Sequence, residues 1–387
     1  MTQKKQKMSE EINELTTVVE YYKLYQSAST TPPPPPATTD PPTNAIDNNT
    51  SFWSEQEEWT TNHETTLQSK INQNQSKCDI VSSSPNGRYI VNQYEKDACL
   101  NWENFYRRNK TNFFKDRHYL AKAFPREFHP LYWDEVMEKG EDGTSGNDEN
   151  DTQHETNLKH DDDDYVYVEI GCGVGNAVLP LLERSTLLAK TQQIQNNNPP
   201  PSKKISVWGF DFSSVAIDLL HQDERFIQAQ KDGRAKAAVW DITCTSPHDI
   251  LLSQEGNQTL YQKANVAMLL FCLSAINPTK MKKAALHASQ TLKPGGILCF
   301  RDYGRYDEAQ MKLSSQRNKK LDSPNFYVKS DGTRCYYFTI EDVEGLFDEA
   351  GLEVLELKYI RRIYKNFGEG GAERRRVWVQ GRFRKPC

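Results

Sequence analysis

Three glycines at alternate positions, Gly171, Gly173 and Gly175, directly follow the largely apolar run 166–170. A run rich in Val, Ile and Tyr is typical of a buried strand, and the residues after the last glycine favour a helix. A strand, a glycine turn and a helix together let a nucleotide-like ligand approach the backbone closely. A dinucleotide fold needs a further glycine where Asn176 stands, so the spacing disfavours a nicotinamide oxidoreductase.

Two carboxylates are predicted at the ends of the next two strands. Asp211 follows the run 205–210, and Asp241 follows the run 237–240. A carboxylate at the end of the second strand can accept both ribose hydroxyls of an adenosyl group, and Asp241 is then placed to accept from the adenine amino group. Each aspartate alone is also explained as a helix cap or a turn former. Because the two follow successive strands after a glycine turn, a shared ligand is the better explanation for the pair.

The remaining elements of the core must position these groups. Further strands are predicted at 266–273, 297–302, 352–360 and 376–383, with helices at 279–292 and after a capping box that begins at Thr339. The strand at 266–273 is apolar throughout, as expected where helices cover both faces of a sheet. The predicted fold class is therefore α/β, with a seven-stranded, Rossmann-like doubly wound sheet.

Composition divides the chain into four segments. They are a disordered low-complexity tail at 1–95, a helical aromatic and basic extension at 96–137, an acidic disordered linker at 138–164 and the catalytic domain at 165–387. No apolar run approaches the roughly 18 residues of a membrane span, and the beginning of the chain lacks the apolar core of a secretory signal. The 8 cysteines contain no C-x-x-C pair, which suits reduced thiols and gives no zinc signature. We therefore expect a cytoplasmic or nuclear protein without a metal site.

The segment 96–137 combines aromatic rings with positive charge. Trp102 and Tyr106 are four residues apart, so on a helix they share a face. A compact Lys-Asp-Arg-His cluster follows at 115–118. An aromatic helix can pack on the sheet and cover a cofactor. Cations between aromatic residues also fit RNA, because bases stack on rings while phosphates meet Lys and Arg. The alternative for the cluster is an internal salt bridge, in which Asp116 pairs with Arg117 or with a core residue.

Several longer strings are more specific. They are FFKDRH at 113–118, EIGCGVGN at 169–176, DFSS at 211–214, LSAINP at 273–278, FRDYGRYD at 300–307 and NFYVKSDGTR at 325–334. Together these strings resemble the tRNA 3-methylcytidine methyltransferases, a class I family that uses S-adenosylmethionine. The resemblance implies methylation at N3 of the cytidine that opens the anticodon loop, in threonine or serine tRNAs. A protein or small-molecule methyltransferase is the alternative function, although it has no need for basic flanks.

The resemblance also implies roles for individual residues. Cofactor contacts fall on Trp102, Tyr106, Glu169, Gly171, Gly173, Gly175, Asp211, Asp241 and Leu270. Candidate RNA contacts are Arg107, Arg108, Lys115, Arg117, His118, Arg305 and Arg334. The partner is the anticodon stem-loop of a tRNA, and an aminoacyl-tRNA synthetase or another tRNA-binding helper is a further candidate partner.

Two residues at the end of the fifth strand, Asp302 and Tyr303, are the catalytic candidates. Cytosine N3 carries a free lone pair, so its methylation needs no general base or metal. The methylated base is cationic, and a carboxylate or an aromatic face would stabilise it. The alternative for Asp302 is a salt bridge with Arg301 or Arg305.

Overall fold

The computed structural model describes residues 51–52, 61–128, 131, 164–195, 204–251, 259–366 and 372–387. Most of the predicted tail and nearly all of the predicted acidic linker lie outside the described residues, so those two expectations stay predictions. All described residues belong to one compact unit.

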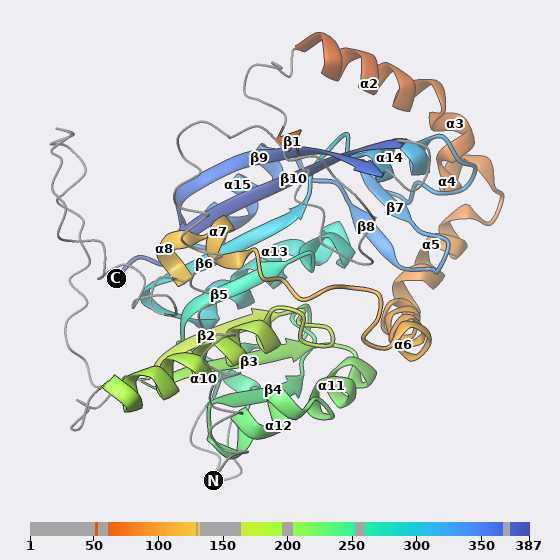
Figure 1. The fold of residues 1–387 in the computed structure, drawn as a ribbon. Coiled ribbons are helices and arrows are strands. Elements are labelled where there is room, and N and C mark those ends of the chain that lie inside the picture. The colour runs from red at the N-terminus through yellow and green to blue at the C-terminus, as the bar shows by residue number, and fades with distance from the viewer. Residues whose placement is uncertain are drawn as a thin grey trace, which may run out of the picture. The chain divides into compact units, whose positions relative to one another are not determined.

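A twisted sheet forms the centre of this unit (Figure 1). Its strand order is β1-β9-β10-β6-β5-β2-β3-β4. The strands are β1 (Ser51–Phe52), β2 (Tyr165–Ile170), β3 (Ile205–Asp211), β4 (Ala235–Val239), β5 (Ala264–Leu270), β6 (Leu292–Tyr303), β9 (Glu353–Asn366) and β10 (Ala372–Arg384). Strands β4, β3, β2, β5 and β6 pair in parallel, whereas β10 pairs antiparallel with β6 and β9. The predicted seven-stranded sheet is confirmed, and the two-residue β1 adds an outer edge.

The order of the strands reverses between β2 and β5, which pair side by side. In open α/β sheets ligands bind beyond the carboxyl ends of the strands at such a reversal. The residues that follow β2, β3, β5 and β6 therefore meet at one edge of the sheet.

Helices cover both faces of the sheet (Figure 1). They are α10 (Val178–Gln195), α11 (Ser214–His221) and α12 (Glu224–Lys231) on one face, and α13 (Pro278–Thr291) and α15 (Ile340–Glu349) on the other. The predicted capping box is present, since the Thr339 hydroxyl accepts from the amide of Asp342 and the Asp342 carboxylate accepts from the amide of Thr339. Burial on both sides explains why the central strands are almost wholly apolar.

The predicted disordered tail is wrong for residues 61–95. This part of the chain folds into α2 (Thr61–Gln73), α3 (Gln75–Cys78), α4 (Ile80–Ser83) and α5 (Gly87–Lys96), and α6 (Ala98–Asn109), α7 (Leu120–Ala123) and α8 (Pro125–Phe128) follow. The first helices run beside α14 (Glu308–Ser314) and the hairpin of β7 (Phe326–Val328) and β8 (Arg334–Tyr336) (Figure 1). Ile80 and Val91 lie in the main hydrophobic core. A few well-placed apolar side chains thus fasten helices whose overall composition is polar.

We expect Ile80→Ala to lower the free energy of unfolding by about 2–5 kcal/mol, because the side chain is 1% exposed and its removal leaves a cavity. Urea unfolding monitored by circular dichroism measures this loss. Ile46→Ala makes the same chemical change within the low-complexity tail and is the matched control. An Ile80→Ala protein as stable as the wild type would contradict the packing of this side chain in the core.

Candidate functional site

The glycine turn after β2 has a backbone that other residues adopt only with strain. Gly171, Gly173 and Gly175 have φ values of 74°, 54° and 90°, in the left-handed region that favours glycine. A Cβ atom at Gly173 would lie 2.7 Å from the hydroxyl oxygen of Tyr106. The alternating glycines predicted from the sequence therefore form a tight cradle beneath α6.

Asp211 is tied directly to this turn. Its Oδ2 accepts from the amide of Gly173 at 2.9 Å, and its Oδ1 accepts from the amide of Ser213 at 2.9 Å. Burial raises the pKa of Asp211 to about 6, although these two amides oppose the rise. Each carboxylate oxygen keeps a further lone pair, so Asp211 can still accept from a hydroxyl group bound above the turn.

Helix α6 covers the turn with aromatic rings. The Trp102 and Tyr106 rings lie 5.8 Å apart between centroids, as their i, i+4 spacing predicts. Tyr106 and Phe105 are buried against Val174 of the turn. The aromatic face of α6 therefore has two roles, because it packs on the core and also covers the glycine turn.

Arg117 lies inside this site, and its prediction as an RNA contact is corrected. Its Nη1 donates to Oε1 of Glu169 at 2.9 Å and to the carbonyl of Leu270 at 3.2 Å. The Glu169 side chain is fully buried and that of Arg117 is 15% exposed. Burial raises the pKa of Glu169 to about 7, and the Arg117 charge opposes that rise. Arg117 therefore forms an internal salt bridge, but its partner is Glu169 and not Asp116 as the alternative had it.

Asn176 explains how Arg117 reaches the core. Its side-chain amide donates to the carbonyl of Phe114 at 3.1 Å, and its own carbonyl accepts from the amide of Arg117 at 2.7 Å. Asn176, which stands where a dinucleotide fold has a glycine, therefore holds the segment from Phe114 to Arg117 against the glycine turn. Asp116 pairs with Arg225 at 2.9 Å instead of with its neighbour.

Asp241 and Leu270 complete the predicted cofactor set. The Oδ1 atom of Asp241 accepts from the amide of Thr243 at 2.8 Å and from its hydroxyl at 2.7 Å. Asp241 therefore forms a turn, which was the alternative explanation for this aspartate. It also follows β4, the third predicted strand, as the cofactor explanation expects. Leu270 ends β5 and is fully buried.

Asp302 and Tyr303 end β6 at the same edge of the sheet. Asp302 is 0% exposed, and its two oxygens accept from the amides of Ser274 at 2.9 Å and Tyr303 at 2.8 Å. Burial raises the pKa of Asp302 to about 6. Arg301 and Arg305, its alternative partners, donate to Gln380 and Gln68. The carboxylate is therefore held at the end of β6 by two backbone amides.

Sequence reasoning missed Phe271 and Lys329. Phe271 directly follows β5 and has a φ of 59°, a strained value for an aromatic residue. Its ring lies 5.1 Å from that of Tyr303, and the Arg117 guanidinium carbon lies 5.5 Å from its centroid. Lys329 Nζ lies 5.7 Å from the Tyr303 centroid. An aromatic residue immediately after a buried strand was the signal available for Phe271.

The predicted RNA contacts divide by exposure. Arg107, Arg108, Lys115 and His118 are exposed on and after α6. Arg334 is 7% exposed and pairs with Glu95, so its assignment to RNA is corrected to a buried ion pair. Exposed basic side chains of the predicted set therefore lie on α6 and in the segment that follows it.

The residues at the switch point fit a bound adenosyl cofactor. The glycine turn lets such a ligand approach the backbone closely, and the buried Asp211 offers it a carboxylate acceptor. The aromatic rings of α6 cover the same turn. Within the described ranges, no three His, Cys, Asp or Glu side chains gather as a metal site would require. No helix among these residues is long and apolar enough to span a bilayer.

Comparison with known proteins identifies the family. A methyltransferase domain family matches residues 146–357. The tRNA N(3)-cytidine methyltransferase METTL2 of Xenopus tropicalis is 33% identical over 338 residues, covering 85% of this chain and 88% of the relative. The tRNA N(3)-methylcytidine methyltransferase Mettl2 of Drosophila melanogaster is 34% identical, covering 76% and 73%.

Among solved structures, a SAM-dependent methyltransferase from Methanosarcina mazei covers 58% of this chain and 93% of its own, with 16% identity and a TM-score of 0.37. That likeness is too distant to assign a function, so the family assignment depends on the sequence relatives. At this identity and coverage, the chain belongs to the tRNA N(3)-cytidine methyltransferase family.

Proposed function

We propose that this protein transfers the methyl group of S-adenosylmethionine to N3 of the cytidine that opens the anticodon loop of a tRNA. The observation that carries the proposal is the meeting of two groups at one sheet edge. The cradle of Gly173 and Asp211 lies at the ends of β2 and β3, and Asp302 with Tyr303 lies at the end of β6. The named activity of the sequence relatives supports the same reaction.

The cofactor would be held by the glycine cradle, by Asp211 at its ribose and by the roof of Trp102 and Tyr106. When bound, it supplies an electrophilic methyl group on a positively charged sulfur. Arg117 presents a guanidinium inside the site, which suits the carboxylate of the cofactor's amino-acid part. These assignments use groups already fixed by the protein, so little reordering is required on binding.

The chemical step depends mainly on position. Cytosine N3 attacks with its own lone pair, so the protein has to align the base for in-line transfer and does not have to remove a proton. Positive charge moves from the donor onto the base during the reaction. The Asp302 carboxylate and the rings of Phe271 and Tyr303 stabilise that charge at the reacting edge.

The nucleophile of cytidine is paired in a duplex, so the target base must be unpaired and turned into the site. The exposed Arg107, Arg108, Lys115 and His118 supply the positive surface that meets the phosphates around it. Threonine and serine tRNAs are the proposed substrates, and an aminoacyl-tRNA synthetase or another tRNA-binding protein is the proposed helper.

Incubation with tRNA and isotopically labelled cofactor, followed by mass spectrometry of the nucleosides, tests the proposal. We expect label in 3-methylcytidine, and none in a tRNA whose target cytidine is replaced by uridine. Label in another nucleoside would correct the target atom. Label in protein or small molecules, with none in RNA, would favour the alternative methyltransferase function.

Cofactor affinity should depend on pH through Asp211. In the cofactor-free protein the Asp211 carboxyl has a pKa of about 6. Only its ionised form can accept hydrogen bonds from both ribose hydroxyls. Affinity should therefore be about tenfold weaker near pH 5 than near pH 7, a window below the titration of the cofactor's own amino group. Calorimetry of S-adenosylmethionine binding measures the change. In Asp211→Asn the part of this dependence that comes from Asp211 should disappear, and the part that comes from Glu169, whose pKa is about 7, should stay.

A further inference from the structure

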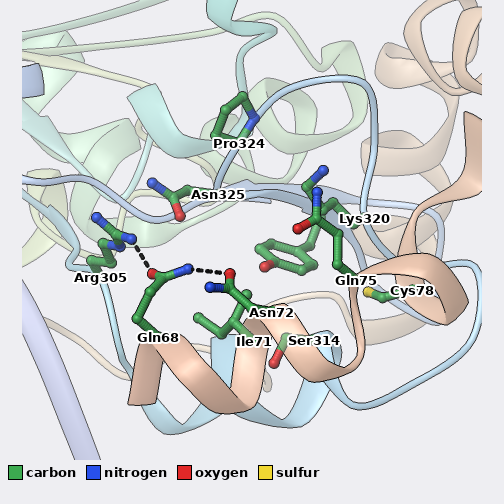
Figure 2. A pocket seen from close by; sticks show the side chains of 11 residues that line it. Gln68, Ile71, Asn72, Gln75, Cys78, Arg305, Ser314, Lys320, Pro324 and Asn325 are labelled. Carbon is green, nitrogen blue, oxygen red and sulfur yellow. Dashed lines mark hydrogen bonds between the residues drawn. The ribbon is translucent and has the colours of Figure 1, made fainter. Parts of the chain in front are cut away.

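A cavity lies outside the cofactor site, between α2, α3 and the segment that follows α14 (Figure 2). Its volume is about 220 Å³, and its lining includes Gln68, Asn72, Gln75, Arg305 and Asn325. Ligand sites for whole small molecules usually enclose about 300–1,000 Å³. The cavity is therefore sized for one planar group of a larger ligand.

Amide side chains form one wall of this cavity. Gln68, Asn72 and Gln75 follow i, i+4, i+7 spacing, which places them on one side of α2 and its continuation into α3. Gln68 donates to Asn72 Oδ1 at 2.7 Å and accepts from Arg305. Figure 2 shows this chain of hydrogen bonds along the wall, with Asn325 beside Arg305.

In this lining the buried Nε of Arg305 has no hydrogen-bond partner within the described part of the chain. Gln75 is exposed at the cavity. Asn325 is held at a φ of 60°, its Oδ1 accepts from Gln310 at 3.2 Å, and its side chain also hydrogen-bonds to the Tyr336 hydroxyl, so this wall of the cavity is fixed by the protein. Amide and guanidinium groups that can both read a base edge and meet a phosphate are typical of nucleotide recognition.

The cavity is also close to the reacting edge. The ring of Tyr303 lies 6.0 Å from that of Tyr337, and Tyr337 lies 5.8 Å from Tyr327, which lines the cavity. Arg305 follows Tyr303 by two residues. Two ring contacts thus connect the proposed methylation site with the cavity, a separation that a single RNA loop can span.

We infer that this cavity binds one unpaired nucleotide of the substrate RNA, other than the methylated cytidine. Its base edge meets the side-chain amides of Asn72 and Gln75, and Arg305 meets its phosphate or an acceptor on the base. The inference builds on the proposed function, because it supplies a second contact to the same RNA. It also gives α2 and α3 a role in choosing the substrate.

Abasic substitution tests this inference. The RNA is an anticodon stem-loop hairpin in which each loop nucleotide except the target cytidine is replaced in turn by an abasic residue. Fluorescence anisotropy at one salt concentration measures its affinity for the full chain. In the wild type, one position should weaken binding by about fivefold or more when its base is removed. Asn72→Ala and Gln75→Ala should each reduce that penalty to less than about twofold, and the penalties at the other positions should stay unchanged.

Asn62→Ala is the matched control, because Asn62 is an exposed amide on the same helix but does not line the cavity. It should keep the wild-type pattern. An identical pattern in the cavity variants and the wild type, or an equal loss for every hairpin, would overturn the inference. Nucleoside analysis of the intact hairpin separates the two proposals: if the wild type binds this hairpin but places no methyl group on it, the proposed function fails and the cavity can still be judged.

Discussion

Arg117→Ala is expected to abolish S-adenosylmethionine binding and to lower the free energy of unfolding by about 3–5 kcal/mol. Arg117 is the ion partner of Glu169, whose side chain is fully buried. Removing one partner of a buried pair leaves an uncompensated charge, which costs about that much. Calorimetry with the cofactor and a urea unfolding curve measure the two effects. The salt dependence of tRNA binding should keep its wild-type slope.

Lys115→Ala is the matched comparison, two residues away and exposed. It should leave the unfolding curve unchanged and reduce the log–log salt slope by about 0.7–0.9 if its ammonium meets one phosphate. The double variant Arg117→Met with Glu169→Gln should recover part of the stability but not cofactor binding. A stable Arg117→Ala protein with a reduced salt slope would return Arg117 to the RNA surface and contradict the buried pair.

The cofactor edge could be predicted because its signals are tied to regular structure. Alternating glycines after a buried strand can serve only where the backbone has positive φ, and Gly171 to Gly175 adopt such values. Asp211 is the last residue of β3, which pairs with β2 in parallel, so topology alone brings it beside the turn. The side chains there are fixed by the sheet, and sequence position is enough to place them.

The charged cluster at 115–118 could not be resolved in the same way. It lies in an irregular segment, where no helical or strand period decides which side chain points inward. Lys115 is exposed, whereas Arg117 pairs with a buried carboxylate far away in the sequence. Arg334 likewise pairs with Glu95, which is far away in the sequence. Long-range ion pairs of this kind leave no trace in local sequence spacing.

Helices α2 to α5 were missed for a related reason. Ile80 and Val91 are buried in the core, but they lie among Asn, Gln and Ser residues whose composition favours disorder. Short helices gain most of their stability from tertiary packing, not from their own propensity. The surface that holds them includes α14 and the β7–β8 hairpin, which are distant in the sequence.

Asp302→Asn is expected to lower kcat by about 10²–10³-fold, with the KM for S-adenosylmethionine changed less than about threefold. The residue is 0% exposed, so its charge acts in a low-dielectric environment, where electrostatic stabilisation of a developing charge has about this value. The wild-type kcat should also fall below about pH 6 as the carboxyl, whose pKa is about 6, becomes protonated. The asparagine variant should lose this dependence.

Tyr303→Phe separates the carboxylate from the aromatic surface beside it. It keeps the ring that lies 5.1 Å from Phe271 and removes only the hydroxyl, so kcat should stay within about tenfold of the wild type. If Asp302 has only a structural role, its asparagine variant should behave differently. As the acceptor for the amides of Ser274 and Tyr303, it would then contribute only to stability, and its asparagine variant would melt earlier with an unchanged kcat and pH profile. Single-turnover methylation across pH, measured beside the melting curves of both variants, distinguishes a carboxylate that stabilises the cationic base from one that only orders the loop after β6.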